Sequence, residues 1–241
     1  KEQYKTVRES MPATGNRGVI MTVCPTGAGT ATKIRDLILD KLSIARTMDV
    51  IPVSALEDID EAVSSLGNRL CVVVGSIDPE IDDVPFVGVD EILSDEGLKR
   101  VERLLKGWDS SELTGPVREV ESREDILSLI RSQMHRFVSS VTPEEAEIVC
   151  DTVLRSLENE FYARALPVDL MSRVYLHTAC MVDRIASGNE LELPAWGENE
   201  RKRRKDEFAQ LKQILDNAGA RVDLKVPESE IDYFLAALPS N

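Results

Sequence analysis

The run Gly18-Val19-Ile20-Met21-Thr22-Val23 is short, apolar and β-branched, and the glycine-containing segment Cys24-Pro25-Thr26-Gly27-Ala28-Gly29-Thr30 follows it directly. The run predicts a buried strand, and the glycines predict a turn after it. A helical pattern follows over residues 31–45. The apolar side of this predicted helix is formed by Ile34, Leu37, Ile38 and Leu42. Strand, loop and helix in this order are typical of the start of an α/β domain.

Three further strand patterns follow, at residues 49–53, 70–74 and 85–89. A helical pattern at 56–66 lies between the first two of them, and another at 98–105 follows the last. The run at 70–74 is apolar throughout, which is typical of a central parallel strand covered on both faces. Pro52 indicates that the strand at 49–53 lies at an edge of the sheet or ends there. We therefore expect a small open parallel α/β sheet over residues 18–107, with right-handed connections.

Everything after residue 122 is helical in pattern. Residues 1–17 are polar and predict a tail, and residues 108–122 have no periodicity and predict a linker. Thr142 followed by Pro143 is a strong signal for the start of a helix. The helical patterns cover residues 123–141, 142–162, 167–187, 198–217 and 227–238. We expect these to form a five-helix bundle over residues 123–241.

Composition limits the possible functions. The chain has 241 residues, 42% hydrophobic and 30% charged, with a net charge of −14, which argues against direct nucleic-acid contact. No apolar run approaches the roughly twenty residues that would span a bilayer. The four cysteines lack CxxC spacing, so we expect free thiols in a reducing cytoplasm, with no disulfides, metal site or cofactor. The chain begins at Lys1 rather than Met, so we expect a fragment.

The loop after the first strand is a candidate anion site. Ligands of open α/β sheets bind beyond the carboxyl ends of the strands, and a helix N-terminus there favours anions. The loop lacks a Walker A pattern, and Thr32 stands where a dinucleotide fingerprint needs its last glycine. A cysteine phosphatase would need an arginine at Thr30. The Cys24 thiol therefore remains a candidate for phosphorylation. The candidate anion-binding residues are Thr26, Gly27, Gly29 and Thr30. The alternative is that the loop is a purely structural glycine turn.

A second candidate is His177, one of only two histidines in the chain. On the helix predicted at 167–187, Arg173 lies one turn before it and Arg184 two turns after it. A neutral imidazole is a nucleophile, and guanidinium groups pair with phosphate oxygens, so the pattern suits a phosphoryl acceptor. The alternative is a half-buried histidine with a structural hydrogen bond.

The segment Tyr175-Leu176-His177-Thr178-Ala179-Cys180-Met181-Val182-Asp183-Arg184 resembles the signature of PTS regulation domains, the phosphotransferase-controlled helical modules of bacterial transcription regulators. It is most similar to the version in levanase-operon-type, sigma-54-dependent activators, whose usual ending resembles residues 226–234 here. The resemblance implies that His177 receives phosphate. The loop at Cys24 resembles the phosphocysteine loop of galactitol-type enzyme IIB domains, with departures at Pro25 and Gly29, and this resemblance implies an enzyme-IIB-like domain over residues 18–107.

These resemblances imply a regulatory fragment of a PTS-controlled transcription activator that responds to sugar availability. A PTS phosphocarrier or an enzyme IIB protein would donate the phosphoryl group, and on family grounds we expect a homodimer. His135, with Arg131 and Arg136 nearby, is a weaker second acceptor. The alternatives are an enzyme-IIB-type phosphoryl-transfer unit with Cys24 as nucleophile, or an oligomerisation module. The basic run at 201–205, bracketed by acidic residues, is typical of a solvated helix face.

Overall fold

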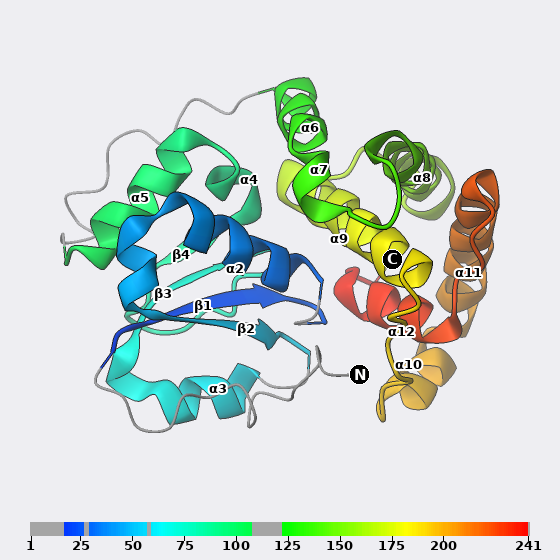
Figure 1. Cartoon of the computed structure of the whole chain (residues 1–241). Helices are drawn as coiled ribbons and strands as arrows, with labels where there is room; N and C mark the ends of the chain where they lie inside the picture. The colour runs from blue at the N-terminus through cyan, green and yellow to red at the C-terminus, as the bar shows by residue number, and fades with distance from the viewer. Residues whose placement is uncertain (1–16, 27–28, 57–58, 108–121, 241) are drawn as a thin grey trace. The chain divides into compact units, whose positions relative to one another are not determined.

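The computed structural model describes residues 17–26, 29–56, 59–107 and 122–240. The chain divides into two compact units, residues 1–129 and 130–241, and the break lies inside helix α6 (Arg123–Ser132). Figure 1 colours the first unit blue to green and the second green to red. The predicted tail and linker lie outside the described residues, except for Arg17 and Ser122.

The first unit is built on a four-stranded parallel sheet in the order β2-β1-β3-β4 (Figure 1). Its strands are β1 (Val19–Cys24), β2 (Asp49–Ser54), β3 (Leu70–Gly75) and β4 (Phe86–Gly88). All three pairings are parallel, as the alternation of strands and helices predicted. β1 and β3, in the middle of the sheet, are buried along almost their whole length, because both of their faces are covered.

Alternate residues of β1 face opposite sides of the sheet. Val19, Met21 and Val23 form one buried cluster with Ala62 and Leu66 of α3 (Ile59–Leu66). The intervening residues of the strand are also fully buried, on the side that α2 (Thr30–Lys41) covers. Figure 1 shows α2 and α3 on opposite sides of the sheet. The β1–α2 loop follows the last residue of β1 and therefore lies at the carboxyl edge of this parallel sheet.

Pro52 lies in β2, at one end of the sheet, as its sequence predicted. The backbone N–H of Asp49 donates to the carbonyl oxygen of Gly18, just before β1, and the N–H of Ala55 donates to that of Cys24, at the end of β1. Backbone groups of a strand alternate in direction, so the odd-numbered residues of β2 point toward β1 and the nitrogen of Pro52 points away from it. The sheet therefore loses no hydrogen bond at the proline.

The remaining elements of the first unit are short apart from one helix. They are η1 (Ser43–Thr47), η2 (Gly67–Arg69), α4 (Val89–Ile92) and α5 (Asp95–Leu105). The helix predicted at 31–45 ends earlier than expected, at Lys41, and continues as the 3₁₀ turn η1.

The second unit is helical. After the end of α6 it contains α7 (Met134–Phe137), α8 (Pro143–Ser156), the π-helical turn η4 (Leu157–Phe161), α9 (Val168–Ala186), α10 (Gly197–Arg203), α11 (Lys205–Gly219), η5 (Ala220–Val222) and α12 (Glu228–Ala237). The helix start predicted at Thr142 is confirmed: its hydroxyl accepts the N–H of Glu145 at 3.2 Å, and the Glu145 carboxylate accepts the N–H of Thr142 at 2.9 Å.

Two of the predicted helices are interrupted, so the predicted five-helix arrangement is not confirmed. The pattern at 123–141 breaks at Gln133, between α6 and α7, and the pattern at 198–217 breaks at Arg204, between α10 and α11. At the second break the Arg204 side chain is buried and reaches carbonyl oxygens of the last helical residues of the unit. A tertiary contact of this kind overrides local helix propensity.

Candidate functional site

Helix α9 positions His177 in the interior of the second unit. From Leu170 to Arg184 every residue of α9 is buried except Arg173, so the helix lacks a broad solvent face. Helices α7 and α8 lie against it (Figure 1). A helix that is buried nearly all round must place its polar side chains in the core, and His177, Asp183 and Arg184 are such side chains.

The His177 imidazole is only 3% exposed. Its ring packs edge-on against the ring of Phe234 in α12, with the ring centroids 4.9 Å apart and the planes at 82°. Its Nε2 atom is buried and has no hydrogen-bond partner among the described residues. Burial lowers the pKa of His177 to about 3, with a smaller contribution from the positive charge of Arg184. The side chain is therefore neutral, the nucleophilic form, but it is closed off from solvent in this conformation.

Arg184 forms an ion pair with Glu230 of α12 in the same interior. The guanidinium donates from Nε to Oε1 at 3.0 Å and from Nη2 to Oε2 at 2.6 Å. The Glu230 side chain is fully buried. The sequence singled out Arg184 as a phosphate-binding residue; the structure places it near His177 but on a carboxylate that the sequence analysis did not identify. The other predicted partner, Arg173, is partly buried, and that burial lowers its pKa, opposed by the charge of Asp169.

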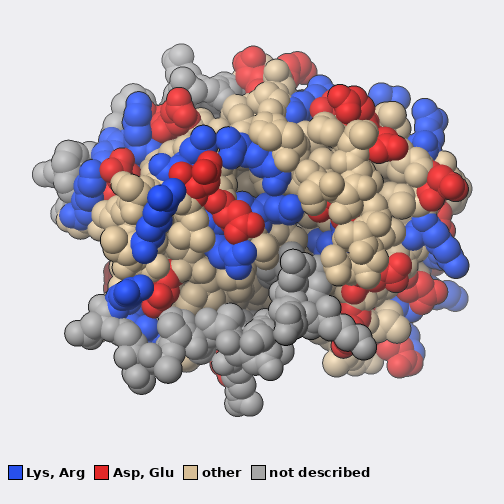
Figure 2. Space-filling model, in the orientation of Figure 1, with Lys and Arg blue, Asp and Glu red and all other residues tan. Residues whose placement is uncertain are grey.

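Two more arginines hold α12. Arg201 binds the buried carboxylate of Asp232 through Nε and Nη2, each at 2.6 Å, and also contacts Glu228. Arg204 donates to the carbonyl oxygens of Leu235 and Leu238. The run at 201–205 is therefore not only a solvated face. Arg201 and Arg204 bind α12, whereas Lys202 and Arg203 are mostly exposed and pair with Glu198 and Glu200. Figure 2 shows the two signs of charge side by side over α10 and α11.

His135 lies on the short helix α7, where its side chain is exposed. The two arginines expected beside it have other partners. Arg131 donates to Asp151 at 2.7 Å and to the Tyr175 hydroxyl at 3.2 Å, and these bonds raise its pKa. Arg136 donates to Gln133 at 2.7 Å. The structure therefore does not bring the predicted phosphate-binding group together around His135.

The loop at Cys24 lies where the sequence predicted, between the end of β1 and the start of α2. Cys24 is fully buried, and its Sγ atom lies 3.7 Å from the hydroxyl oxygen of Thr26. Ser54, at the end of β2, donates to the Pro25 carbonyl oxygen at 2.8 Å and so fixes the loop to the neighbouring strand. Gly29 precedes α2 and Thr30 begins it, but Gly27 lies outside the described residues. The thiol faces the interior of the described loop rather than solvent.

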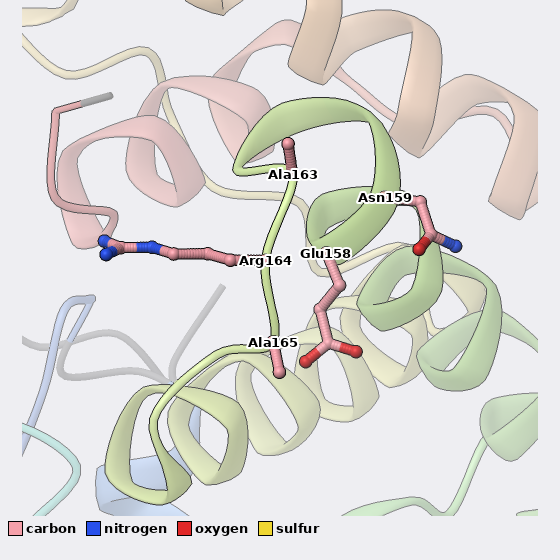
Figure 3. Close-up of a pocket in the computed structure, with 5 residues that line it drawn as sticks. All are labelled: Glu158, Asn159, Ala163, Arg164 and Ala165. Carbon is pink, nitrogen blue, oxygen red and sulfur yellow. The ribbon is translucent and has the colours of Figure 1, made fainter.

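A surface hollow of about 330 Å³ lies beside the π-helical turn η4. Figure 3 shows the Glu158 carboxylate turned toward the chain at Ala165, with Asn159 and Arg164 pointing outward in different directions. Glu158 accepts the backbone N–H of Leu166 at 2.8 Å, and Ala163 has a positive φ of 51°. These features close the turn between η4 and α9, and they bring no reactive group together.

The PRD domain model matches residues 154–239. This segment contains His177, Arg184 and the whole of α12. Over 193 residues the chain is 26% identical to the transcriptional regulatory protein DagR of Salmonella typhimurium (strain 14028s / SGSC 2262). The alignment covers 72% of this chain and 19% of that relative, so the chain spans about a fifth of its length. No solved structure matches the chain.

The two matches support a transcriptional regulator that contains a PRD domain, and they indicate no enzyme family. Neither match confirms the levanase-type, sigma-54-dependent activator or the enzyme-IIB-like character of the first unit. Among the described residues no helix is long and apolar enough to cross a bilayer. In the same part of the chain no cluster of His, Cys, Asp and Glu has the arrangement of a metal site.

Proposed function

We propose that this chain is a regulatory part of a transcription activator controlled by the sugar phosphotransferase system, with His177 as its phosphoryl acceptor. The observation that carries the proposal is the PRD domain match, which places His177 inside a module whose family members are controlled by phosphotransferase-system phosphorylation. The neutral state of the imidazole adds chemical support, because only the neutral ring has a free electron pair for phosphorus.

The phosphoryl donor in this proposal is a PTS phosphocarrier or an enzyme IIB protein. Phosphorylation adds close to two negative charges and three acceptor oxygens in the core of a unit that belongs to an acidic chain. A change of that size alters packing, and a homodimer formed through the helical unit would transmit it to domains outside this chain. The first unit serves as the enzyme-IIB-like companion of the regulatory helices, and the protein works in the cytoplasm.

Labelling with radioactive phosphoenolpyruvate and the general PTS phosphocarriers tests the proposal. The wild-type chain is compared with the variants H177Q, H135Q and C24S, and the label is located by peptide mass spectrometry. We expect label on His177, loss of it in H177Q, and unchanged labelling in H135Q and C24S. H135Q is the matched control, since it changes the only other histidine, which is exposed.

The same experiment separates the alternatives. Label on Cys24 that passes on to sugar would support a phosphoryl-transfer enzyme unit, and complete absence of label would support an oligomerisation module. The structure gives the enzyme alternative little support, because Cys24 is buried and both histidines of the chain belong to the second unit.

A further inference from the structure

Two side-chain contacts connect α9 with α12 at the proposed acceptor. His177 packs on Phe234, and two turns further along α9, Arg184 binds Glu230. Glu230 and Phe234 are four residues apart and so lie on the same side of α12, one turn from each other. The earlier residue of α9 meets the later residue of α12, so the two helices run in opposite directions across the pair of contacts. Helix α12 therefore places an aromatic ring against the acceptor and a carboxylate on Arg184.

In this conformation the acceptor atom of His177 does not reach solvent. His177 is 3% exposed and Phe234 is 1% exposed, and Nε2 is buried. A phosphoryl donor is a folded protein, and its phosphorus must come within bonding distance of that nitrogen. The Phe234 ring already touches the imidazole, so a phosphoryl group on Nε2 also requires new space. Phosphorylation of this histidine needs α12 to move.

The charges favour the same movement. Arg184 and Glu230 together are neutral in a fully buried site. A phosphoryl group brings roughly −1.5 to −2 charges and competes with Glu230 for the guanidinium. A buried carboxylate that loses its only charged partner is strongly destabilised. Once Arg184 binds the phosphoryl group, the Glu230 carboxylate is stable only in contact with water. A movement of α12 exposes Glu230 to water.

We propose that α12 is a displaceable cover over His177, and that Glu230 occupies Arg184 in place of phosphate until His177 is phosphorylated. This inference rests on the proposed function and adds its regulation. In the transfer step the Nε2 electron pair attacks phosphorus and forms the N–P bond. The P–N bond to a phosphocarrier histidine, or the P–S bond to an enzyme IIB cysteine, breaks, and the donor atom keeps its electron pair. The proton on Nδ1 stays on the His177 ring.

The chain contains a reporter of this movement. Trp196 packs edge-on against Tyr233 of α12, with the ring centroids 5.4 Å apart at 88°. Replacing the second tryptophan (W108F) leaves Trp196 as the only one in the chain. On phosphorylation we expect Trp196 emission to shift to longer wavelength, and hydrogen exchange to become faster in residues 228–238.

Two carboxylate-to-amide variants test whether the position of α12 over His177, and not a general loosening of the unit, limits phosphorylation. E230Q keeps a hydrogen-bonding side chain on Arg184 but removes the competing charge, so we expect its labelling on the order of tenfold faster than wild type. It should also speed hydrogen exchange in α12 without any phosphorylation. D151N removes the charge of a carboxylate on α8 that pairs with Arg131, and it should label at the wild-type rate.

The outcomes distinguish this inference from the proposed function. If His177 is phosphorylated while exchange in α12 stays unchanged, or if E230Q labels like wild type, the cover is wrong and the acceptor role stands. If neither protein takes label at His177 but E230Q alone loosens α12, the cover stands and the acceptor role is wrong. If neither protein takes label at His177 and E230Q does not loosen α12, both are wrong.

Discussion

The guanidinium of Arg204 donates a hydrogen bond of 3.0 Å to the carbonyl oxygen of Leu238, which lies 34 residues further along the chain. The same Nη1 atom donates to the Leu235 carbonyl oxygen at 2.6 Å, and Nε donates to Glu207 at 3.0 Å. The last carbonyl groups of a helix have no partner within the helix. Arg204 supplies partners for two carbonyl groups at the end of α12.

The first prediction compares two neighbouring arginines. R204A should lower the free energy of unfolding of the chain by about 3 kcal/mol, since it removes a donor from the carbonyl groups of Leu235 and Leu238 and the charged partner of Glu207. R203A removes a mostly exposed side chain paired with Glu200 and should cost under about 0.5 kcal/mol. Urea denaturation followed by circular dichroism measures both. Equal losses in the two variants would mean that Arg204 does not secure α12.

The second prediction concerns Asp183, which accepts the backbone N–H groups of Ser139 and Ser140 at 2.6 Å each. This buried carboxylate fixes the turn between α7 and α8 to α9. D183N should destabilise the unit by roughly 1–3 kcal/mol, because an amide cannot accept both bonds with the strength of a charged oxygen. S139A removes only the longer hydroxyl contacts, at 3.4 and 3.5 Å, and should be close to neutral. Thermal unfolding of the two variants provides the comparison.

The third prediction is a dependence of stability on pH through His177. Burial holds its pKa at about 3 in the folded chain, below the ordinary value of 6.5. Below pH 6.5 the unfolded chain therefore binds a proton that the folded chain does not, and stability falls as the pH falls. The loss is about 1.4 kcal/mol per pH unit, or roughly 2 kcal/mol between pH 6.5 and 5. Stability is fully retained above pH 6.5.

Urea titrations at pH 7 and pH 5 test this dependence. H177Q should lose that part of the pH dependence, whatever its own stability, since glutamine does not titrate. H135Q, at the exposed histidine, is the control and should behave like wild type. A wild-type slope in H177Q would show that another group causes the acid sensitivity.

The fourth prediction is steric and lies in the first unit. A Cβ atom on Gly75 would lie 2.2 Å from the Val23 carbonyl oxygen, so β1 and β3 can approach closely only with glycine there. G75A should destabilise the first unit by more than about 2 kcal/mol. G67A, where a Cβ meets nothing within 4 Å but φ is +49°, should cost only about 1 kcal/mol. Similar losses in both would argue against close packing at Gly75.

The strands could be predicted from the sequence because their signals are local. The β-branched runs at Val19 and Leu70 are long enough to name a buried strand, and Pro52 marks the edge correctly. The break at Arg204 could not be predicted. No glycine or proline marks it, and the partners that make it favourable are carbonyl groups more than thirty residues away. Local propensity carries no information on such a contact.

The candidate site, too, could be predicted from the sequence only in part. Helical spacing correctly places Arg184 near His177, but it cannot show which residue of another helix faces them. An acidic residue in the first turn of α12 suits the helix dipole, so Glu230 gave no sign of being buried. The spacing of four between Glu230 and Phe234 was the only local signal, and it is common in exposed helices. The burial of His177 likewise depends on contacts with other helices, such as its packing on Phe234 of α12, and not on its own helix.

Pro52 also affects how copies of this protein meet. A strand at the end of a sheet can recruit another chain by offering it a row of N–H donors, and one donor in that row is missing here because the proline nitrogen points outward. The sheet loses no internal hydrogen bond, but an incoming strand would lack one N–H donor and would meet the bulky proline ring. The residue thus guards against edge-to-edge aggregation, and replacing it with valine would make the first unit more prone to self-association.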